Sequence, residues 1–283
     1  MELIDIGVNL SHDAFDHDRS GVMARARQSG IVQMIVTGSS IAITHQAIEL
    51  ARMHAGILFA TAGIHPHHAT ELDEGSLAEL EQLVADPAVV ALGECGLDYF
   101  RDYSPRDVQR GAFAQQMALA ARVGKPVFLH QRDAHDDFVA IVREHRSALA
   151  GAVAHCFTGG RHELESYLKL ELAIGITGWI CDERRGTHLA PLVRDIPAAS
   201  LMIETDAPYL LPRDLKTKPA ARRNEPMFLL HVADAVARAR GVSLEALARS
   251  TTATARAFFR LPPAPSGGEA VKVSFELLGT NSY

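Results

Sequence analysis

LMIETDAP, residues 201–208, is an apolar run that ends in two carboxylates, Glu204 and Asp206. A run of this kind, closed by a small residue and a proline, is typical of a buried strand that delivers its last side chains to a pocket. Because a buried charge costs roughly several kcal/mol unless it is paired or bound to a metal, such an end indicates a functional site. Four earlier apolar runs end in the same way, on His65, His67 and His68, on Glu94 and Asp98, on His130, Arg132 and Asp133, and on His155.

These runs alternate with helical segments along most of the chain. About eight runs of strand length are separated by stretches whose apolar residues recur at helical spacing, among them 41–56, 105–124 and 184–196. This order predicts an α/β fold, a (β/α)8 TIM barrel, with the helices after residue 225 completing the outer ring. A doubly wound open sheet is the alternative.

The composition bounds the class of protein. One barrel domain is expected over residues 1–260, and 261–283, rich in proline and glycine at its start, is expected to be a flexible tail that could be foreign to the natural chain. The net charge of -6 argues against a surface that binds duplex nucleic acid non-specifically.

The sequence also predicts a cytoplasmic protein with free thiols. Its three cysteines have no CxxC spacing, and no apolar run is long enough to span a membrane. No protein partner or membrane contact is indicated, and a monomer is expected.

In a barrel of this kind the loops that follow the strands build one active site. His130 and His155, on adjacent predicted strands, could each donate an imidazole nitrogen to one cation. Glu94 could bridge that cation to a second one, and Asp206 could bind there while accepting a proton from water. Glu204 shares the face of Asp206 and is predicted to support the ligands from behind. His65 should also lie at the mouth, where ligand, phosphate binder and helix cap all remain open.

Eight short segments carry a family resemblance. They are DIGVNL, GIHPH, GECGLD, FLHQRDA, HCFTG, ITGWICDERRG, ETDAPYLLPRDL and RRNEP, in this order between about residues 3 and 260. Together they resemble the TatD family of metal-dependent deoxyribonucleases. The resemblance implies a barrel of the metal-dependent hydrolase type, Mg2+-dependent hydrolysis of DNA phosphodiesters, chiefly as a 3′ to 5′ exonuclease on single strands, and a part in DNA repair. It also implies metal ligands at Glu94, His130, His155 and Asp206, with His65 beside the substrate phosphate.

The first strand departs from the pattern of the wider family. Most members carry an aspartate followed by His-x-His there, whereas DIGVN places Gly7 and Asn9 at the two imidazole positions. A glycine side chain has no ligand atom, and Asn9 offers only a neutral carbonyl oxygen. We therefore expect Asn9 to support the metal ligands from behind and not to bind the ion itself. We therefore expect one or two divalent ions and favour Mg2+ over a tightly held zinc pair, with Mn2+ or Zn2+ as alternatives.

The expected mechanism assigns catalysis to Asp206 and Glu94. Asp206 deprotonates a water, while the ion held by Glu94 polarises a phosphate oxygen. His65, Arg132 and Arg223 are expected to bind the substrate phosphate.

The expected substrate is single-stranded DNA or a DNA 3′ end. The loop 212–223, PRDLKTKPAARR, carries five basic residues against one acid and offers positive charge to phosphates. Trp179, Phe157 and Tyr209 could stack unpaired bases, although core packing is an equal alternative for each. No duplex-reading motif occurs in the sequence.

Two rival functions use the same ligands. An amidohydrolase-like enzyme could act on a small ester, lactone or amide, since fold and metal do not fix the substrate. A binding module could have lost its chemistry with the first-strand histidines, although retention of Glu94, His130, His155 and Asp206 argues against it.

Overall fold

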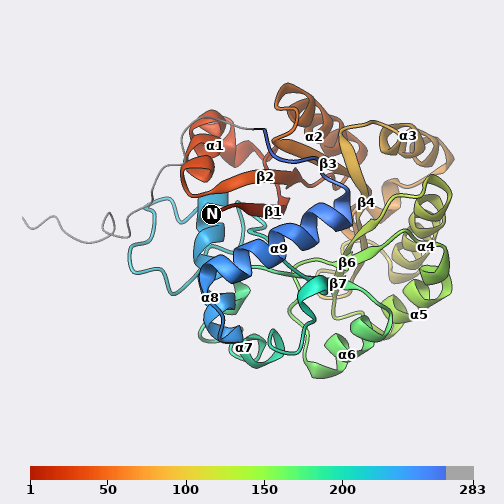
Figure 1. The fold of residues 1–283 in the computed structure, drawn as a ribbon. Helices are drawn as coiled ribbons and strands as arrows, with labels where there is room; N and C mark the ends of the chain where they lie inside the picture. The colour runs from red at the N-terminus through yellow and green to blue at the C-terminus, as the bar shows by residue number, and fades with distance from the viewer. Residues whose placement is uncertain (266–283) are drawn as a thin grey trace, which may run out of the picture.

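A computed structural model describes residues 1–265 as a ring of eight parallel strands inside a ring of helices (Figure 1). Each strand pairs with the next along the chain. Between the last strand and the first, the Asp206 amide donates to Gly7 O at 2.9 Å and the Asn9 amide donates to Ala207 O at 2.8 Å. The predicted TIM barrel is confirmed and the open sheet is wrong. The strands are β1 (Leu3–Val8), β2 (Ile31–Val36), β3 (Leu58–Ala62), β4 (Val89–Asp98), β5 (Val127–Arg132), β6 (Ala152–Ala154), β7 (Ala173–Ile176) and β8 (Leu201–Ile203).

Nine α-helices and six short 3-10 helices occur in the described part of the chain. The α-helices are α1 (Arg19–Gln28), α2 (Ile41–Met53), α3 (Glu74–Val84), α4 (Arg106–Val123), α5 (His135–His145), α6 (Arg161–Lys169), α7 (Leu189–Leu192), α8 (Leu229–Arg240) and α9 (Leu244–Phe259). The 3-10 helices are η1 (Asp13–Phe15), η2 (Pro66–Glu71), η3 (Arg146–Ala148), η4 (Gly178–Cys181), η5 (Ala198–Ser200) and η6 (Pro226–Phe228).

Local sequence explains where several elements begin and end. The strands are buried on both faces, which is why they read as nearly continuous apolar runs. Ser40 caps α2 and Ser243 caps α9, each through its side-chain oxygen. Gly124, at φ 68°, ends α4 in the left-handed conformation that glycine adopts without steric cost.

The helix predicted over 184–196 is wrong in extent, because only α7 forms within it. Asp182 caps a turn there instead, and its Oδ1 accepts the backbone N–H of Arg184 at 3.0 Å. The Gly186 amide then closes the turn by donating to Asp182 O at 2.8 Å. These bonds offer the backbone a local alternative to the helix.

Helix α9 closes the N-terminal end of the barrel and lies across the strands in Figure 1. Its Phe259 packs with Ile4, Phe59 and Phe128 inside the barrel. Leu261 joins this cluster, and Pro262 O accepts a hydrogen bond from Gln33 at 3.0 Å, so the first residues after the predicted boundary pack on the barrel. The remainder of the predicted tail, 266–283, lies outside the described residues.

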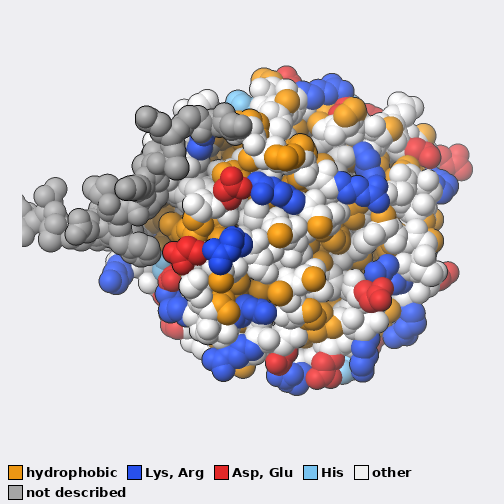
Figure 2. Space-filling model, viewed as in Figure 1, with side chains coloured by type: hydrophobic (Ala, Val, Ile, Leu, Met, Phe, Trp, Pro, Cys, Tyr) orange, Lys and Arg blue, Asp and Glu red, His pale blue; other side chains and the backbone are white. Residues whose placement is uncertain are grey.

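Figure 2 shows the face of the molecule that α9 crosses. Basic, acidic and apolar side chains are interspersed over its visible part, without a continuous cationic surface. Within residues 1–265, no helix combines the length and apolarity that a membrane crossing requires.

Candidate metal centre

Strand β4 brings two carboxylates to the mouth of the barrel because glycines let it lie against β5. A Cβ atom on Gly96 would lie 1.9 Å from His130 O, and one on Gly93 would lie 2.2 Å from Phe128 O. Both glycines also have a positive φ, which is 145° at Gly96 and 131° at Gly93. Glu94 and Asp98 are four residues apart on this strand, and both contact His130.

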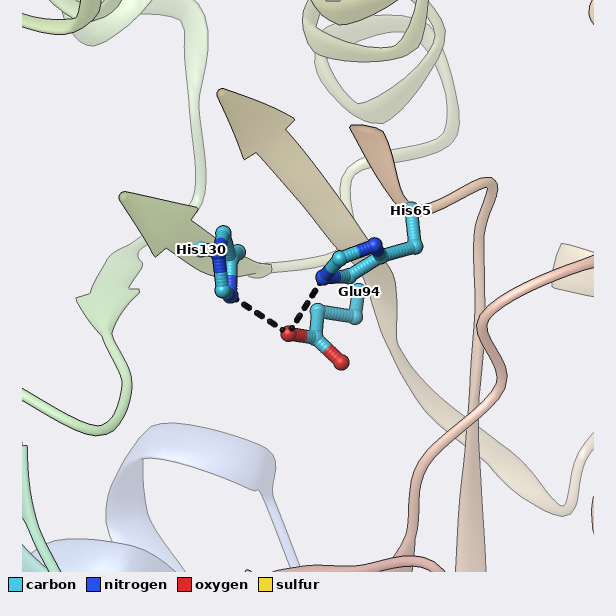
Figure 3. A group of neighbouring side chains, drawn as sticks. All are labelled: His65, Glu94 and His130. Atoms are coloured by element: carbon cyan, nitrogen blue, oxygen red, sulfur yellow. Dashed lines mark hydrogen bonds and ion pairs between the residues drawn. The ribbon is translucent and has the colours of Figure 1, made fainter. Parts of the chain in front are cut away.

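Three imidazoles converge on one oxygen of Glu94. His155 Nε2 lies 2.7 Å from Glu94 Oε1, His130 Nδ1 lies 2.9 Å away, and His65 Nε2 lies 3.3 Å away. Figure 3 shows the Glu94 carboxylate between the rings of His65 and His130. The structure therefore gathers four of the predicted site residues, from the ends of β3, β4, β5 and β6.

A second carboxylate stands behind each of two histidines. His130 Nε2 lies 3.3 Å from Asp98 Oδ2, and His155 Nδ1 lies 3.4 Å from Glu204 Oε2. Each ring thus faces Glu94 with one nitrogen and an outer carboxylate with the other. In metal sites such an outer carboxylate accepts the ring N–H, fixes the tautomer and leaves the inner nitrogen free to bind the ion.

Asp98 stands at one of the polar strand ends of the sequence, but no role in the site was assigned to it, since a loop cap was an equal alternative. Besides facing His130, its Oδ2 pairs with His67 Nε2 at 2.9 Å, and its Oδ1 accepts the Arg101 amide at 2.8 Å. The spacing of Glu94 and Asp98 in GECGLD was the available signal, but its meaning depends on how the two glycines bend β4.

The Glu94 carboxylate and the His130 and His155 rings stabilise one another's charged forms. Burial opposes ionisation of Glu94, but His155, His65 and His130 outweigh it and hold the pKa of Glu94 well below its usual value. Burial likewise disfavours the charged form of His155, yet Glu94 and Glu204 raise its pKa well above the ordinary value. The pKa of His130 is also raised, since Asp98 and Glu94 overcome the effect of burial. Without a cation, protons on the two rings balance the carboxylates.

His65 differs from the other two rings. Burial lowers its pKa to about 4, with Glu94 opposing the shift. Its Nδ1 accepts the His67 amide at 3.1 Å, which makes His65 the N-cap of η2. The proton of the neutral ring therefore resides on Nε2, and that nitrogen is a hydrogen-bond donor toward the centre.

Asp206 lies after β8 and retains some solvent exposure. Its Oδ1 accepts a hydrogen bond from Asn9 Nδ2 at 3.0 Å, which gives Asn9 contact with the site. Burial raises the pKa of Asp206 to about 7, with His155 opposing and Glu94 reinforcing the shift. A carboxyl with this pKa, open to water, is suited to general-base chemistry near neutrality.

Glu204 fills the space that a first-strand side chain would need. A Cβ on Gly7 would lie 2.3 Å from Glu204 Oε2, and one on Gly175 would lie 2.4 Å from Glu204 Oε1. The backbone amide of Cys156 donates to Glu204 Oε1 at 2.5 Å. The buried Glu204 carboxylate therefore occupies the space beside Gly7 in which a histidine side chain at this position would have to lie.

The predicted phosphate binder Arg223 is engaged elsewhere. Its guanidinium donates to Asp18 Oδ1 and Oδ2, both at 2.9 Å, and to Glu225 Oε1 at 2.8 Å. A further bond goes to Ala14 O. Arg223 fastens the chain after β8 to the start of α1, so its donors are committed to these carboxylates and not to a substrate phosphate.

Arg132 and several aromatic rings line the mouth near the cluster. The Arg132 guanidinium stacks 4.2 Å from the Phe100 ring centroid and 5.6 Å from that of Trp179. Phe157 is 4% exposed and belongs to the core, so for this residue the packing alternative holds and base stacking does not. Phe100 and Tyr103, by contrast, were overlooked and are 54% and 67% exposed.

The residues present fit a divalent cation. The inner nitrogens, His130 Nδ1 and His155 Nε2, both lie within 2.9 Å of Glu94 Oε1, so two imidazoles and a carboxylate face one point. His65, Glu94 and His130 each offer a ligand atom within 4.8 Å of the others. Imidazole nitrogens and carboxylate oxygens are the donor types that Zn2+, Mn2+ and Mg2+ accept in proteins.

Solved structures resemble the whole barrel. A TatD homologue named YJJV from Escherichia coli k12 superposes with a TM-score of 0.84 at 28% identity, covering 92% of this chain and 98% of its own. A protein from Saccharomyces cerevisiae described as an uncharacterized amidohydrolase gives a TM-score of 0.80 at 25% identity, covering 91% and 99%.

The sequence comparisons identify the family. A protein of Edwardsiella piscicida named 3′-5′ ssDNA/RNA exonuclease TatD is 53% identical over 259 residues, which cover 92% of this chain and all of that protein. The family model described as TatD related DNase matches residues 4–260. The chain belongs to the TatD-related DNase family.

Proposed function

We propose that the chain is a metal-dependent exonuclease that removes nucleotides from the 3′ end of single-stranded DNA or RNA. The observation that carries this proposal is the placement of His130 and His155, each held between Glu94 and an outer carboxylate. The substrate class comes from two relatives that are 53% and 51% identical to this chain and are named 3′-5′ ssDNA/RNA exonucleases.

In this proposal Glu94, His130 and His155 would hold one divalent cation, and Asp206 would be a further ligand. The ion supplies Lewis acidity toward a phosphate oxygen when it is bound. Because Gly7 and Asn9 offer no imidazole, we propose Mg2+ in a water-rich site, with Mn2+ or Zn2+ as alternative occupants.

The protein groups divide the remaining work. Asp206 accepts the proton of the attacking water, and Asn9 fixes the orientation of its carboxylate. The Nε2–H of His65 donates to a phosphate oxygen, and Arg132 adds positive charge at the end of β5. Asp98 and Glu204 keep the imidazoles in the tautomer that binds the ion.

Exposed aromatic rings favour a single strand as the substrate. Phe100, Tyr103 and Tyr209 are all more than half exposed, and all three follow strands at the mouth of the barrel. Tyr103 packs on His67 with the ring centroids 4.8 Å apart, which links it to the metal centre. Unpaired bases stack on such rings, whereas a duplex keeps its base faces covered.

We also propose that the protein is a cytoplasmic monomer that acts in DNA repair. All three cysteines are free thiols, as expected in a reducing compartment. The repair role rests on the family resemblance alone.

Digestion of end-labelled oligonucleotides tests the activity. With Mg2+ we expect stepwise shortening of a 5′-labelled single strand from its 3′ end, and no reaction after chelation. Failure to cleave DNA or RNA with any divalent ion, together with turnover of a small ester or amide, would favour the amidohydrolase-like alternative.

Metal affinity is expected to rise with pH. The pKa values of His130 and His155 are raised, so the rings hold protons up to higher pH than free histidine does. Binding an ion through these nitrogens must release those protons, hence affinity is lower at acid pH and higher at alkaline pH, by up to about tenfold per pH unit for each proton released. Calorimetric titrations at about pH 6 and about pH 8 measure this, and equal affinities would contradict the ligand assignment.

The outer carboxylates are expected to control metal affinity. Asp98→Asn and Glu204→Gln remove the acceptor charge behind one ring each, and we expect about 10- to 100-fold weaker binding of the ion. Isothermal titration with Mn2+ measures this loss. Asp195→Asn, at an exposed ion pair with Arg161, serves as a control and should leave the affinity unchanged.

The mouth aromatics are expected to govern binding of the strand. Phe100→Ala and Tyr103→Ala should raise KM for an oligonucleotide by about tenfold each, since stacking is worth about 1–3 kcal/mol per base. Hydrolysis of a small dialkyl phosphodiester should not change, because it has no aromatic ring to stack. Val242→Ala, an exposed apolar residue between α8 and α9, is the matched control. Equal KM values for all variants would exclude the stacking surface.

A further inference from the structure

A second group of metal-ligand side chains lies apart from the candidate centre. Cys181 ends η4, Asp214 follows β8, and His231 belongs to α8, and each offers a ligand atom within 4.8 Å of the others. His231 Nε2 lies 2.7 Å from Asp214 Oδ1. None of these residues contributes to the cluster around Glu94.

The chemistry of this group differs from that of the candidate catalytic centre. A thiol, an imidazole and a carboxylate together suit a borderline cation such as Zn2+, whereas Mg2+ does not bind thiolates. Cys181 is 5% exposed, so the residue is buried and would bind a cation from the protein side of the site. Asp214 and His231 remain partly exposed, at 41% and 27% of their side chains, which leaves an open side for a water as fourth ligand.

The surroundings show what a cation would hold together. Asp214 is the one acidic residue of the 212–223 loop, which also carries five basic residues. Arg213 donates to Glu183 Oε1 at 3.0 Å, and its Nε lies 3.5 Å from Asp182 Oδ1, so the segment 182–185 meets the loop here. Both ion pairs between these segments depend on the partly exposed Arg213, and the pair with Glu183, which is exposed, contributes little stability by itself.

We propose that Cys181, Asp214 and His231 bind one Zn2+-like cation that ties the start of the 212–223 loop to η4 and α8. Binding requires loss of the Cys181 proton to solvent, and the cation then balances the thiolate and the carboxylate. This site is structural, is separate from the hydrolytic centre, and does not depend on the proposed nuclease activity.

Cobalt binding to the chelator-treated full-length chain tests the site. Co2+ reports thiolate ligation by a sulfur-to-metal charge-transfer absorption, and we expect this band in the wild-type protein and in Glu94→Gln. Cys181→Ser should lose the band and bind Zn2+ at least about tenfold more weakly at one site. His231→Asn gives a second variant in case Cys181→Ser does not fold. It should lower Zn2+ affinity in the same way.

Two controls make the outcome decisive. Cys156→Ser should keep the band, because Cys156 lies beside Glu204 in the other centre. Zn2+ should also slow tryptic cleavage after Lys216 in the wild type but not in Cys181→Ser, since the cation fixes the loop that carries this residue. Absence of the band from the wild type, its loss in Cys156→Ser instead, or equal Zn2+ affinity in the wild type and Cys181→Ser would overturn the proposal.

Discussion

Asp206→Asn is expected to lower the rate of phosphodiester hydrolysis by about 10²- to 10⁴-fold, the usual contribution of a positioned general base. An amide cannot accept the proton of the attacking water at neutral pH. The fold should persist, because asparagine has the same shape and can still accept the hydrogen bond from Asn9. Asparagine also tolerates the left-handed backbone that Asp206 adopts at φ 54°.

Asp133→Asn is the matched control for this variant. Asp133 ends the β5 segment at the same mouth, is exposed, and has nearly the same backbone conformation at φ 53°. We expect its single-turnover rate to equal that of the wild type. Hydrolysis by Asp206→Asn at a near-normal rate, with metal affinity retained, would show that another group takes the proton.

The pH dependence of the rate provides a second check on Asp206. The pKa of about 7 follows from burial and neighbouring carboxylates in the protein alone. A bound cation favours the ionised carboxylate, so in the metal-loaded enzyme the rate should fall only as pH drops below about 7. Loss of this acid limb in the residual activity of Asp206→Asn would support the assignment.

The sequence predicted the site best where it depends on strand register. Glu94, His130 and His155 follow apolar runs, and equivalent ends of parallel strands meet at one edge of the sheet. The position of each residue at the end of its apolar run was therefore sufficient to predict that the three lie together. In the structure His130 and His155 both lie within hydrogen-bonding distance of Glu94 Oε1.

Residues whose role depends on tertiary contacts were not predictable in this way. Arg223 is basic and follows the last strand, yet its partner Asp18 lies 205 positions away in sequence. Asp98 reaches His130 only because β4 bends at its glycines. The helix expected over 184–196 had suitable spacing, but a side-chain cap at Asp182 outweighed its weak helical propensity.

The largest effect on folding is expected at Gly96. In Gly96→Ala the new Cβ would lie 1.9 Å from the carbonyl oxygen of His130, and φ of 145° is unfavourable for any residue with a side chain. The β4–β5 pairing must then open at the point where Glu94 meets His130, so we expect destabilisation by more than about 4 kcal/mol and loss of metal binding.

Gly111→Ala is the matched control for Gly96→Ala. Gly111 lies inside α4 and a Cβ there has nothing within 4 Å, so alanine should stabilise the helix by up to about 1 kcal/mol. Denaturant unfolding of both variants measures the difference. If Gly96→Ala folded with wild-type stability and bound Mn2+ normally, the close approach of β4 to β5 could not be what positions Glu94 and Asp98, and the geometry of the metal centre would need another origin.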